Sequence, residues 1–305
     1  MSCKSIAGAL GLNFAMKSLF LAAVCLGLGV FAAQAGEIKI VAAENFYGGI
    51  AQQIAGPDAE VSSILSNPNQ DPHEFTTDAS TAKAVADADI VIYSGIGYDS
   101  WMEKLLGTPG KPDRVVICVA TLIGAKDGDN PHIWYDPRTM PALVDKLAEM
   151  LIARSNWTGL PPYEASAKTF KDSMKPELDK IAALKAAYAG TAVTATEPVF
   201  GYMTDALGFK MLNYDFQVNV MNDAEPSAAQ TAAFEKSLTT HTARILFYNS
   251  QVTDPTTDRI KKIAQQAGVP IVGVTETQPP DQKTYADWML HELAAVEAGL
   301  PAKSR

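Results

Sequence analysis

The chain has 305 residues, of which 47% are hydrophobic and 19% charged, so it is long enough for two ordinary domains and apolar enough to fold around a core. Its formal net charge is −9, and the first 35 residues contain two lysines and no acid, so the remainder is more negative still. This acidity disfavours nucleic acid and anionic membrane surfaces as partners, and it is compatible with binding cations.

Residues 1–35 predict a cleavable signal peptide. Lys17 precedes an apolar run, Ser18–Ala33, and Ala-Gln-Ala at the end of the segment predicts cleavage after Ala35. A membrane-spanning helix is the alternative, but the run is short for a full span and no stop-transfer sequence follows it. We therefore expect an exported, periplasmic protein.

The start of translation and the cysteines bear on the same segment. Met16 directly precedes Lys17, so translation could begin at Met1 or at Met16. Cys25 follows Ala-Ala-Val, a poor lipidation sequence, which favours a soluble protein over a lipoprotein. Beyond Ala35 only Cys118 remains, so we expect no internal disulfide, and its apolar setting VVICV predicts a buried strand residue.

After residue 35, short apolar runs alternate with amphipathic segments of helix length. NFYGGIAQQIAG predicts a helix that is capped by Asn45 and ends at Gly56. Near-continuous apolar strands alternating with helices are typical of parallel sheets covered on both faces. We predict an α/β fold of two lobes, 36–156 and 191–305, each a roughly four-stranded, mainly parallel sheet with flanking helices. The runs that predict strands are IKIVAA (38–43), VSSIL (61–65), DIVIYSG (89–95), RVVICVA (114–120), TAVTA (191–195), FKMLN (209–213), RILFYN (244–249) and VPIVGV (269–274).

The segment 157–190 shows no strand pattern. From Pro161 to Tyr188 its apolar residues recur at helical spacing, which predicts one long linking helix of roughly 40 Å. Pro176 should kink this helix or split it in two, and two short packing helices are the alternative.

Two of the four histidines lie directly after a proline in polar loops. His73 follows the second predicted strand in NPNQDPHEF, and His132 follows the fourth in NPHIWYDP. Ligand sites in parallel sheets gather at the carboxyl ends of the strands, and a preceding proline leaves each imidazole little freedom to lose on binding. We predict that both histidines bind a metal ion.

Two glutamates occupy the matching positions in the second lobe. Glu197 follows its first strand, in VTATEPVFGY, and Glu276 follows its last, in VGVTETQPP. Together with His73 and His132 they form a set of two imidazoles and two carboxylates at a cleft between the lobes. Four protein ligands leave little room for a catalytic water, so this set predicts a protein that carries a metal and is not an enzyme.

The sequence resembles the periplasmic solute-binding proteins of zinc and manganese ABC transporters, in which one long helix joins two α/β lobes. The resemblance rests on VAAENFYGGIAQQIAG, SILSNPNQDPHEF, ADIVIYSGIGYDSWMEKLL, NPHIWYDP and VTATEPVFGY. It implies that His73, His132 and Glu197 are ligands, with an acid after the last strand as the fourth. Relatives usually have Asp in that place; Glu276 is our choice here, and Asn249 is the second candidate. It also implies an ABC permease with a cytoplasmic ATPase as partner, and we expect the carrier to be a monomer.

The identity of the metal is less determined than the site. Zinc-type relatives typically have His where Glu197 stands, and many carry a His-rich loop where this chain has only GAKDGDN (124–130). Replacing an imidazole by a carboxylate favours Mn²⁺ or Fe²⁺, whereas the Irving–Williams order keeps Zn²⁺ a close second.

Two other functions stay open. A periplasmic metallohydrolase could use the same cluster with Glu74 as general base, and a binder of metal chelates or an adhesin could use the same fold. The sequence has no HExxH motif or nucleophile elbow to support the enzyme. We predict that His241 and His291 are packing or surface residues, and that Tyr98, Trp101 and Trp134 line the core or the cleft.

Overall fold

The computed structural model describes residues 38–67, 75–155, 162–252 and 255–301, all within one compact unit, Gly36–Arg305. The predicted signal peptide lies outside the described residues, as does His73. In the part of the chain that the structure covers, no helix is both long enough and apolar enough to cross a membrane.

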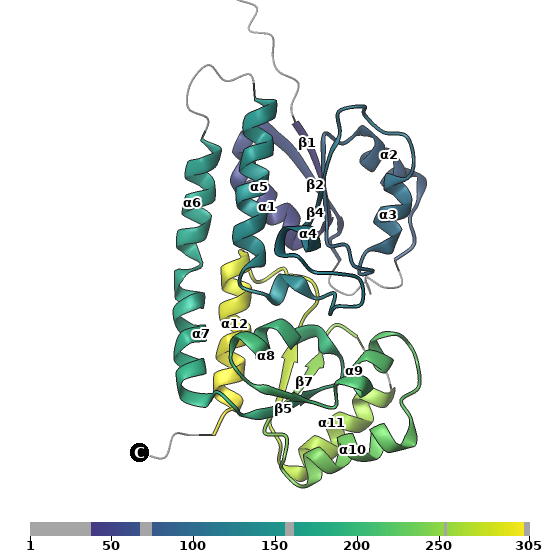
Figure 1. The fold of residues 1–305 in the computed structure, drawn as a ribbon, viewed down its shortest axis with the longest axis vertical. Coiled ribbons are helices and arrows are strands. Elements are labelled where there is room, and N and C mark those ends of the chain that lie inside the picture. Colours follow the sequence, from purple (N-terminus) through teal and green to yellow (C-terminus); the bar gives the residue numbers. More distant parts are fainter. Residues whose placement is uncertain (1–37, 68–74, 156–161, 253–254, 302–305) are drawn as a thin grey trace, which may run out of the picture. The chain divides into compact units, whose positions relative to one another are not determined.

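All eight predicted strands are present, and they form two four-stranded, entirely parallel sheets. The first sheet has the order β2-β1-β3-β4 and the second the order β6-β5-β7-β8, so the two sheets share one topology (Figure 1). In both, the strand order reverses beside the first strand of the sheet, the place where ligands bind in such folds. The strands are β1 (Ile38–Glu44), β2 (Ala59–Leu65), β3 (Ile90–Tyr93), β4 (Val115–Cys118), β5 (Ala192–Ala195), β6 (Lys210–Leu212), β7 (Leu246–Asn249) and β8 (Ile271–Val274).

Helices flank both sheets and connect consecutive strands. The α-helices are α1 (Asn45–Ala55), α2 (Ala79–Asp87), α3 (Ser100–Leu106), α4 (Val119–Ile123), α5 (Thr139–Arg154), α6 (Tyr163–Ser173), α7 (Lys175–Tyr188), α8 (Gly201–Ala206), α9 (Tyr214–Met221), α10 (Ala228–Thr239), α11 (Pro255–Ala267) and α12 (Tyr285–Gly299). Three short 3₁₀ turns, η1 (Gly56–Asp58), η2 (Ile133–Tyr135) and η3 (Pro198–Phe200), follow α1, α4 and β5 within the described residues.

The predicted start of α1 is wrong by one residue. Glu44 is the N-cap, without a side-chain capping bond, and Asn45 is the first helical residue. The Asn45 carboxamide instead bonds the backbone of Gln278, which lies beyond β8: its Nδ2 donates to the carbonyl at 2.8 Å and its Oδ1 accepts from the amide at 3.1 Å. A long-range contact has therefore replaced the local cap. The predicted end at Gly56 is confirmed, and its φ of 62° explains the glycine.

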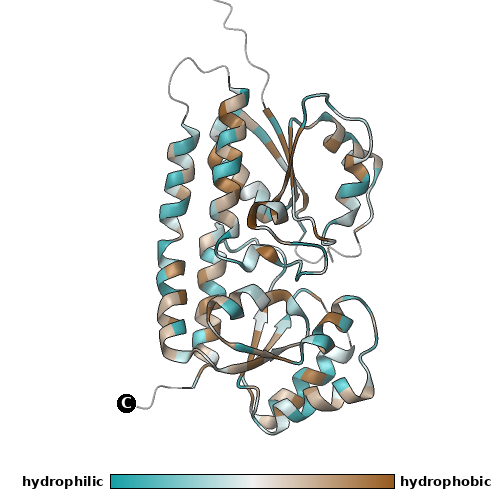
Figure 2. Ribbon diagram, viewed as in Figure 1, coloured by the Kyte–Doolittle hydropathy of each residue, from teal (hydrophilic) through white to brown (hydrophobic). Residues whose placement is uncertain are grey.

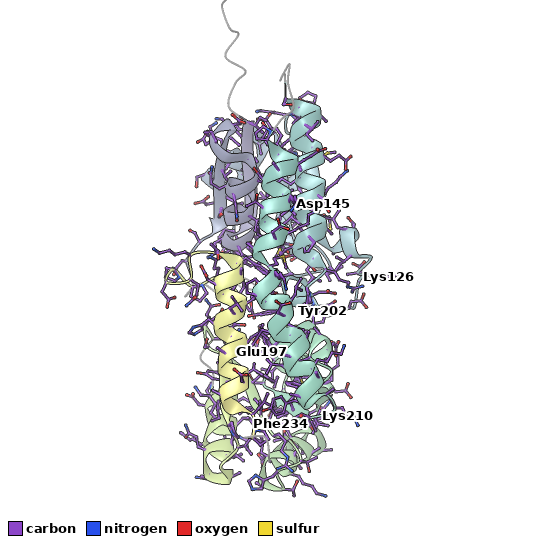
Figure 3. All side chains as sticks on the ribbon, turned by 90° about the vertical axis from the view of Figure 1, so that its left-hand side faces the viewer. Lys126, Asp145, Glu197, Tyr202, Lys210 and Phe234 are labelled. Atoms are coloured by element: carbon purple, nitrogen blue, oxygen red, sulfur yellow. The ribbon has the colours of Figure 1, made fainter. Side chains whose placement is uncertain are left out.

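The linking helix is split, as Pro176 predicted, although the break falls at Met174. Met174 ends α6 with a bond from its amide to the Lys171 carbonyl, and α7 begins anew with Pro176 in its first turn, where the missing N–H is not needed. Met174 keeps helical dihedral angles, so α7 continues α6 (Figure 1). Figure 3 shows α12 running beside α7, against which it packs.

One hydrophobic core spans both sheets, and each sheet has in addition a smaller cluster of buried apolar side chains. Apolar residues gather on the strands and on the inner faces of the helices (Figure 2), and a single cluster of buried side chains includes residues from both sheets, α6, α7 and α12. Within it, a chain of aromatic contacts at centroid distances of 4.9–5.6 Å leads from α1 to β7 through Phe46, Trp288, Tyr135, Phe200 and Phe247. The lobe boundaries at 156 and 191 stay a prediction.

Candidate metal site

His132 lies after β4 and α4, directly before η2, and is fully buried. The rings of Tyr98 and Trp134 pack edge-on around its imidazole. Its Nδ1 lies 2.7 Å from Oδ1 of Asn130, which can only accept a hydrogen bond, so Nδ1 carries the proton. In the neutral ring this leaves the lone pair on Nε2, the form that binds metal ions.

Asn130 is itself held by the second sheet's connections. Its Nδ2 donates to the Pro198 carbonyl at 2.7 Å, and the Tyr202 hydroxyl donates to the Asn130 carbonyl at 2.9 Å. Its Oδ1 also accepts from the His132 amide at 3.1 Å. The orientation of the His132 imidazole therefore depends on Asn130, which precedes the linking helices in the chain, and on Pro198 and Tyr202, which follow them.

Glu276 lies in the turn after β8 and is 1% exposed. Its Oε1 is 3.5 Å from Nε2 of His132, so a carboxylate from the second sheet faces the imidazole from the first. Asn249 Nδ2 donates to Oε1 at 2.9 Å and the Tyr98 hydroxyl donates to Oε2 at 3.2 Å. Burial and this neighbouring carboxylate raise the pKa of Tyr98 well above its ordinary value, so the phenol keeps the proton it donates.

The backbone around Glu276 is fixed by three side chains from distant segments. Gln251 Oε1 accepts from the amides of Glu276 and Thr277 at 2.8 and 2.9 Å. Glu292 of α12 accepts from the Thr275 amide at 3.0 Å, and the Tyr135 hydroxyl donates to the Thr275 carbonyl at 2.6 Å. The turn is thus held before any ligand arrives.

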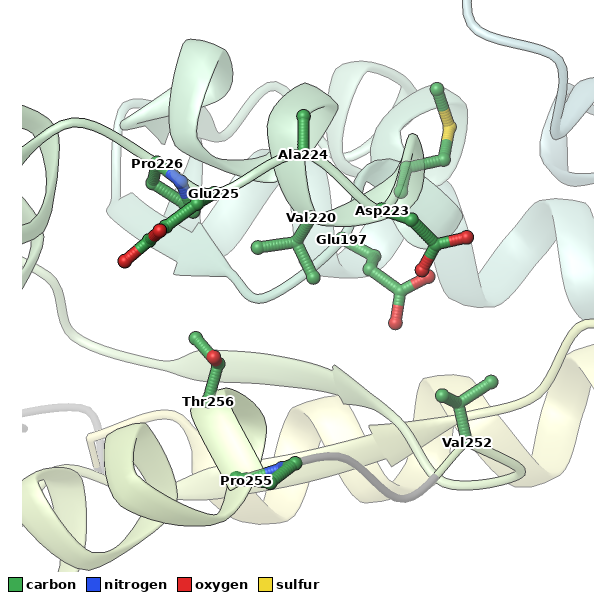
Figure 4. Close-up of a pocket in the computed structure, with 10 residues that line it drawn as sticks. Glu197, Val220, Asp223, Ala224, Glu225, Pro226, Val252, Pro255 and Thr256 are labelled. Carbon is green, nitrogen blue, oxygen red and sulfur yellow. The ribbon is translucent and has the colours of Figure 1, made fainter.

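Glu197 follows β5 as predicted and is 7% exposed. It lines a pocket of about 370 Å³ beside Asp223 and Glu225, and Figure 4 shows Glu197 and Asp223 directing their carboxylates into it. Among the described residues no three His, Cys, Asp or Glu side chains form a group that could hold a metal ion. The structure therefore joins His132 to Glu276 but does not add Glu197 to that pair, and His73 lies outside the described residues.

The remaining predicted positions fall as follows. His241 and His291 are exposed, which confirms them as surface residues, and Tyr98, Trp101 and Trp134 are buried.

Asn249, the second candidate for the fourth ligand, donates a hydrogen bond from its side-chain nitrogen to Glu276, while its side-chain oxygen accepts from the Gln251 amide at 3.1 Å. Sequence reasoning missed the contact of Tyr98 with Glu276 and the role of Asn130, although Asn130 stands two residues before His132 in the NPH motif.

The pair of His132 and Glu276 has the chemistry of half a cation site. A neutral imidazole nitrogen and a carboxylate oxygen, both buried and both oriented by hydrogen bonds, suit a divalent transition metal ion better than an organic solute. Burying a carboxylate costs free energy unless a positive charge or several donors compensate it, and a bound cation would supply that charge.

Two curated relatives are similar over most of the chain. The zinc-binding lipoprotein AdcA of Streptococcus pneumoniae serotype 4 is 25% identical over 291 residues, which cover 86% of this chain but only 56% of AdcA. The manganese-binding lipoprotein MntA of Halalkalibacterium halodurans is 24% identical, with 93% of this chain and 96% of MntA covered. The chain therefore spans about half the length of AdcA and nearly all of MntA.

The fold also matches solved structures, and the family itself can be assigned. The periplasmic zinc-binding protein TroA of Treponema pallidum superimposes with a TM-score of 0.71 at 17% identity, covering 87% of this chain and 99% of TroA. This confirms the predicted fold of two parallel α/β sheets. The family described as zinc-uptake complex component A, periplasmic (ZnuA), matches residues 40–299, so this chain belongs to that family of solute-binding receptors.

Proposed function

We propose that the chain captures one divalent transition metal ion as cargo and delivers it to an ABC permease. In this proposal His73, His132, Glu197 and Glu276 bind the ion. The observation that carries it is the buried contact of His132 with Glu276, 3.5 Å apart, because it unites the carboxyl ends of both sheets in one site. Asn249 then acts by holding Glu276, and not as a ligand.

The family supports the wider parts of this proposal. Its members are uptake receptors outside the cytoplasm and not enzymes, which argues against the metallohydrolase. We infer that the partner is a membrane permease driven by a cytoplasmic ATPase, that the signal peptide is cleaved after Ala35, and that the carrier is a monomer.

The metal itself follows only from the donor set. A site with two imidazoles and two carboxylates is better suited to Mn²⁺ or Fe²⁺ than a site with three imidazoles. By the Irving–Williams order, however, Zn²⁺ binds such a site at least as tightly as Mn²⁺ in solution. The relatives point both ways, since AdcA is named for zinc and MntA for manganese. We propose Mn²⁺ or Fe²⁺ as the cargo, with Zn²⁺ as the alternative.

Elemental analysis of protein purified without added metal tests the proposal directly. We expect about one equivalent of transition metal per chain, and competitive titration with Mn²⁺, Fe²⁺ and Zn²⁺ then ranks the ions. Affinity should fall as the pH is lowered, because protons compete for the imidazole lone pairs.

Matched histidine variants locate the site. His132→Ala and Glu276→Gln should each weaken metal binding at least about tenfold, whereas His241→Ala and His291→Ala, which change exposed histidines, should leave it unchanged. His73→Ala and Glu197→Gln test the two ligands that the described structure does not join to this pair. Unchanged affinity in His132→Ala would show that the site is elsewhere.

A further inference from the structure

A second cavity, of about 410 Å³, contains none of the proposed metal ligands. Its walls come from the loop before His132 and from α8 and α9, the helices that follow β5 and β6. The side chains that matter are Asp129, Tyr202, Thr204, Asp205, Tyr214 and Gln217. The volume lies within the range of sites for small molecules and is far larger than a bare ion requires.

The hydrogen-bond donors of the cavity are largely used inside the protein. The Tyr202 hydroxyl donates to the Asn130 carbonyl at 2.9 Å, and Thr204 Oγ1 donates to the Gly201 carbonyl at 2.7 Å. The Asn130 and Gln217 carboxamides each use one N–H on a backbone carbonyl, at 2.7 Å in both cases. The donors that remain among the described lining side chains are the second N–H of each carboxamide and the Tyr214 hydroxyl.

Gln217 provides an acceptor that the protein leaves unsatisfied. It is completely buried, and its Nε2 donates to the Leu212 carbonyl at 2.7 Å, which fixes the orientation of the amide. Its Oε1 has no hydrogen-bond donor among the described residues. A buried carbonyl oxygen without a donor costs about 1–3 kcal/mol, so a ligand that supplies an N–H is favoured here.

The charge of the cavity is negative. The Asp205 carboxylate has no hydrogen bond or ion pair within the described chain, and the Asp129 carboxylate accepts only the backbone amide of Lys126 at 2.8 Å. Asp129, Asp205 and Tyr214 line the same cavity, and burial, followed by these two carboxylates, raises the pKa of Tyr214. The lining has no Lys, Arg or His in the described residues, and the nearby Arg138 is bound to Asp136.

We propose that this cavity binds a small organic cation that carries several N–H donors, a primary ammonium or a guanidinium compound. The carboxylates of Asp129 and Asp205 would neutralise the charge, and Gln217 Oε1 would accept an N–H. The rings of Tyr202 and Tyr214 suit an organic cation through cation–π contact, which a hydrated metal ion does not use as well. Two carboxylates are also fewer than a protein cage for Ca²⁺ contains.

Calorimetric titration of the full chain with methylguanidinium, 1,4-diaminobutane and tetramethylammonium tests this at constant ionic strength. We expect saturable binding of the first two compounds and at least about tenfold weaker binding of tetramethylammonium, which has no N–H. Asp205→Asn should weaken methylguanidinium binding about tenfold, and Tyr214→Leu about two- to fivefold, the loss of one cation–π contact at an exposed site.

Two controls make the outcome decisive. Asp281→Asn makes the same change of charge in an exposed loop outside the cavity and should leave binding unchanged. Asp205 and Tyr214 are both exposed, so their variants should fold, as circular dichroism would show. Absence of saturable binding, equal affinity for tetramethylammonium, or equal losses in Asp205→Asn and Asp281→Asn would each overturn the proposal.

Discussion

At the scale of single residues, Asn130 shows how one side chain can serve two parts of the fold. Its oxygen fixes the His132 ring, and its nitrogen bonds the carbonyl of Pro198, the residue after Glu197. No ionisable group is needed for this, because a carboxamide offers a donor and an acceptor at once. We therefore expect Asn130 to matter for metal binding without touching the metal.

Asn130→Ala should weaken metal affinity about ten- to hundredfold, the usual effect of removing a residue that orients a ligand. Asn130→Asp retains the acceptor and should recover part of the loss. Metal titration measures the affinity, and the ¹⁵N shifts of the His132 ring report its tautomer. The control is Asn222→Ala, which removes an exposed carboxamide. A normal tautomer in Asn130→Ala would contradict the assigned role.

Glu177 is the opposite case, an ionisable side chain that is buried without a hydrogen-bond partner among the described residues. It is fully buried in the first turn of α7, and neither carboxyl oxygen has a hydrogen-bond partner among the described residues. Burial raises its pKa to about 8 from an ordinary value of 4.5. Between these two pH values the unfolded chain releases a proton that the folded protein keeps, so this residue lowers the free energy of unfolding as the pH rises.

Glu177→Gln should remove that dependence. The variant should gain stability relative to the parent protein between pH 5 and pH 8, by an amount on the order of 3 kcal/mol. Urea unfolding at both pH values measures the difference. Glu164→Gln, which changes the exposed first-turn glutamate of α6, is the control and should show no such gain. An equal effect of Glu177→Gln at both pH values would show that the carboxyl group is already ionised when folded.

At the scale of elements, the turn after β8 is the best-supported part of the site. Its backbone groups are bonded by side chains from α1, η2, α12 and the segment after β7. A ligand on such a turn loses little conformational entropy when it binds a metal. The turn is therefore a place where changes that do not touch the metal should alter affinity.

Gln251→Ala leaves the buried amides of Glu276 and Thr277 without their acceptor. We expect a loss of about 1–3 kcal/mol in unfolding free energy, because unsatisfied buried donors are costly, and a parallel weakening of metal binding. Gln265→Ala on the exposed face of α11 is the matched control. Thermal unfolding with and without metal separates the two effects, and full metal affinity in Gln251→Ala would show that the turn holds its shape without this amide.

At the scale of the whole molecule, the shared core decides how the chain unfolds. Phe46 of α1 and Trp288 of α12 lie in contact, and α7 packs on α12, so one core spans both sheets, beside a smaller cluster of buried side chains in each. Small units with one core unfold cooperatively, whereas independent domains unfold separately.

Calorimetry should therefore show a single unfolding transition for residues 36–305. The predicted first lobe expressed alone, 36–156, should fail to fold, because Phe46 loses its contact with Trp288 and the Trp134 carbonyl loses the hydrogen bond from Tyr285. Saturating metal should raise the midpoint, with about 2.7 kcal/mol of stabilisation at a free concentration of one hundred times Kd. Two resolved transitions would show that the shared core does not couple the two sheets.

The sequence by itself determined the strands, their parallel pairing and the positions of Glu197 and Glu276 directly after strands of the second sheet. These depend on local patterns: eight short apolar runs, helix-length spacers, and Pro-His or Glu steps after the runs. These patterns predict the structure well because a strand of a parallel sheet is buried on both faces. Apolar residues are therefore favoured along its whole length, wherever the strand lies in the sheet.

Only the tertiary structure decided which side chains meet. Tyr98 and Glu276 are 178 residues apart and Asn45 and Gln278 are 233 apart, so no local pattern predicts their contacts. The same applies to the unused N-cap at Asn45, to the common core and to the acceptor-rich cavity around Gln217. The physical reason is that hydrogen bonds and packing depend on distances in space, which the whole fold fixes, whereas strand and helix patterns depend on spacing along the chain.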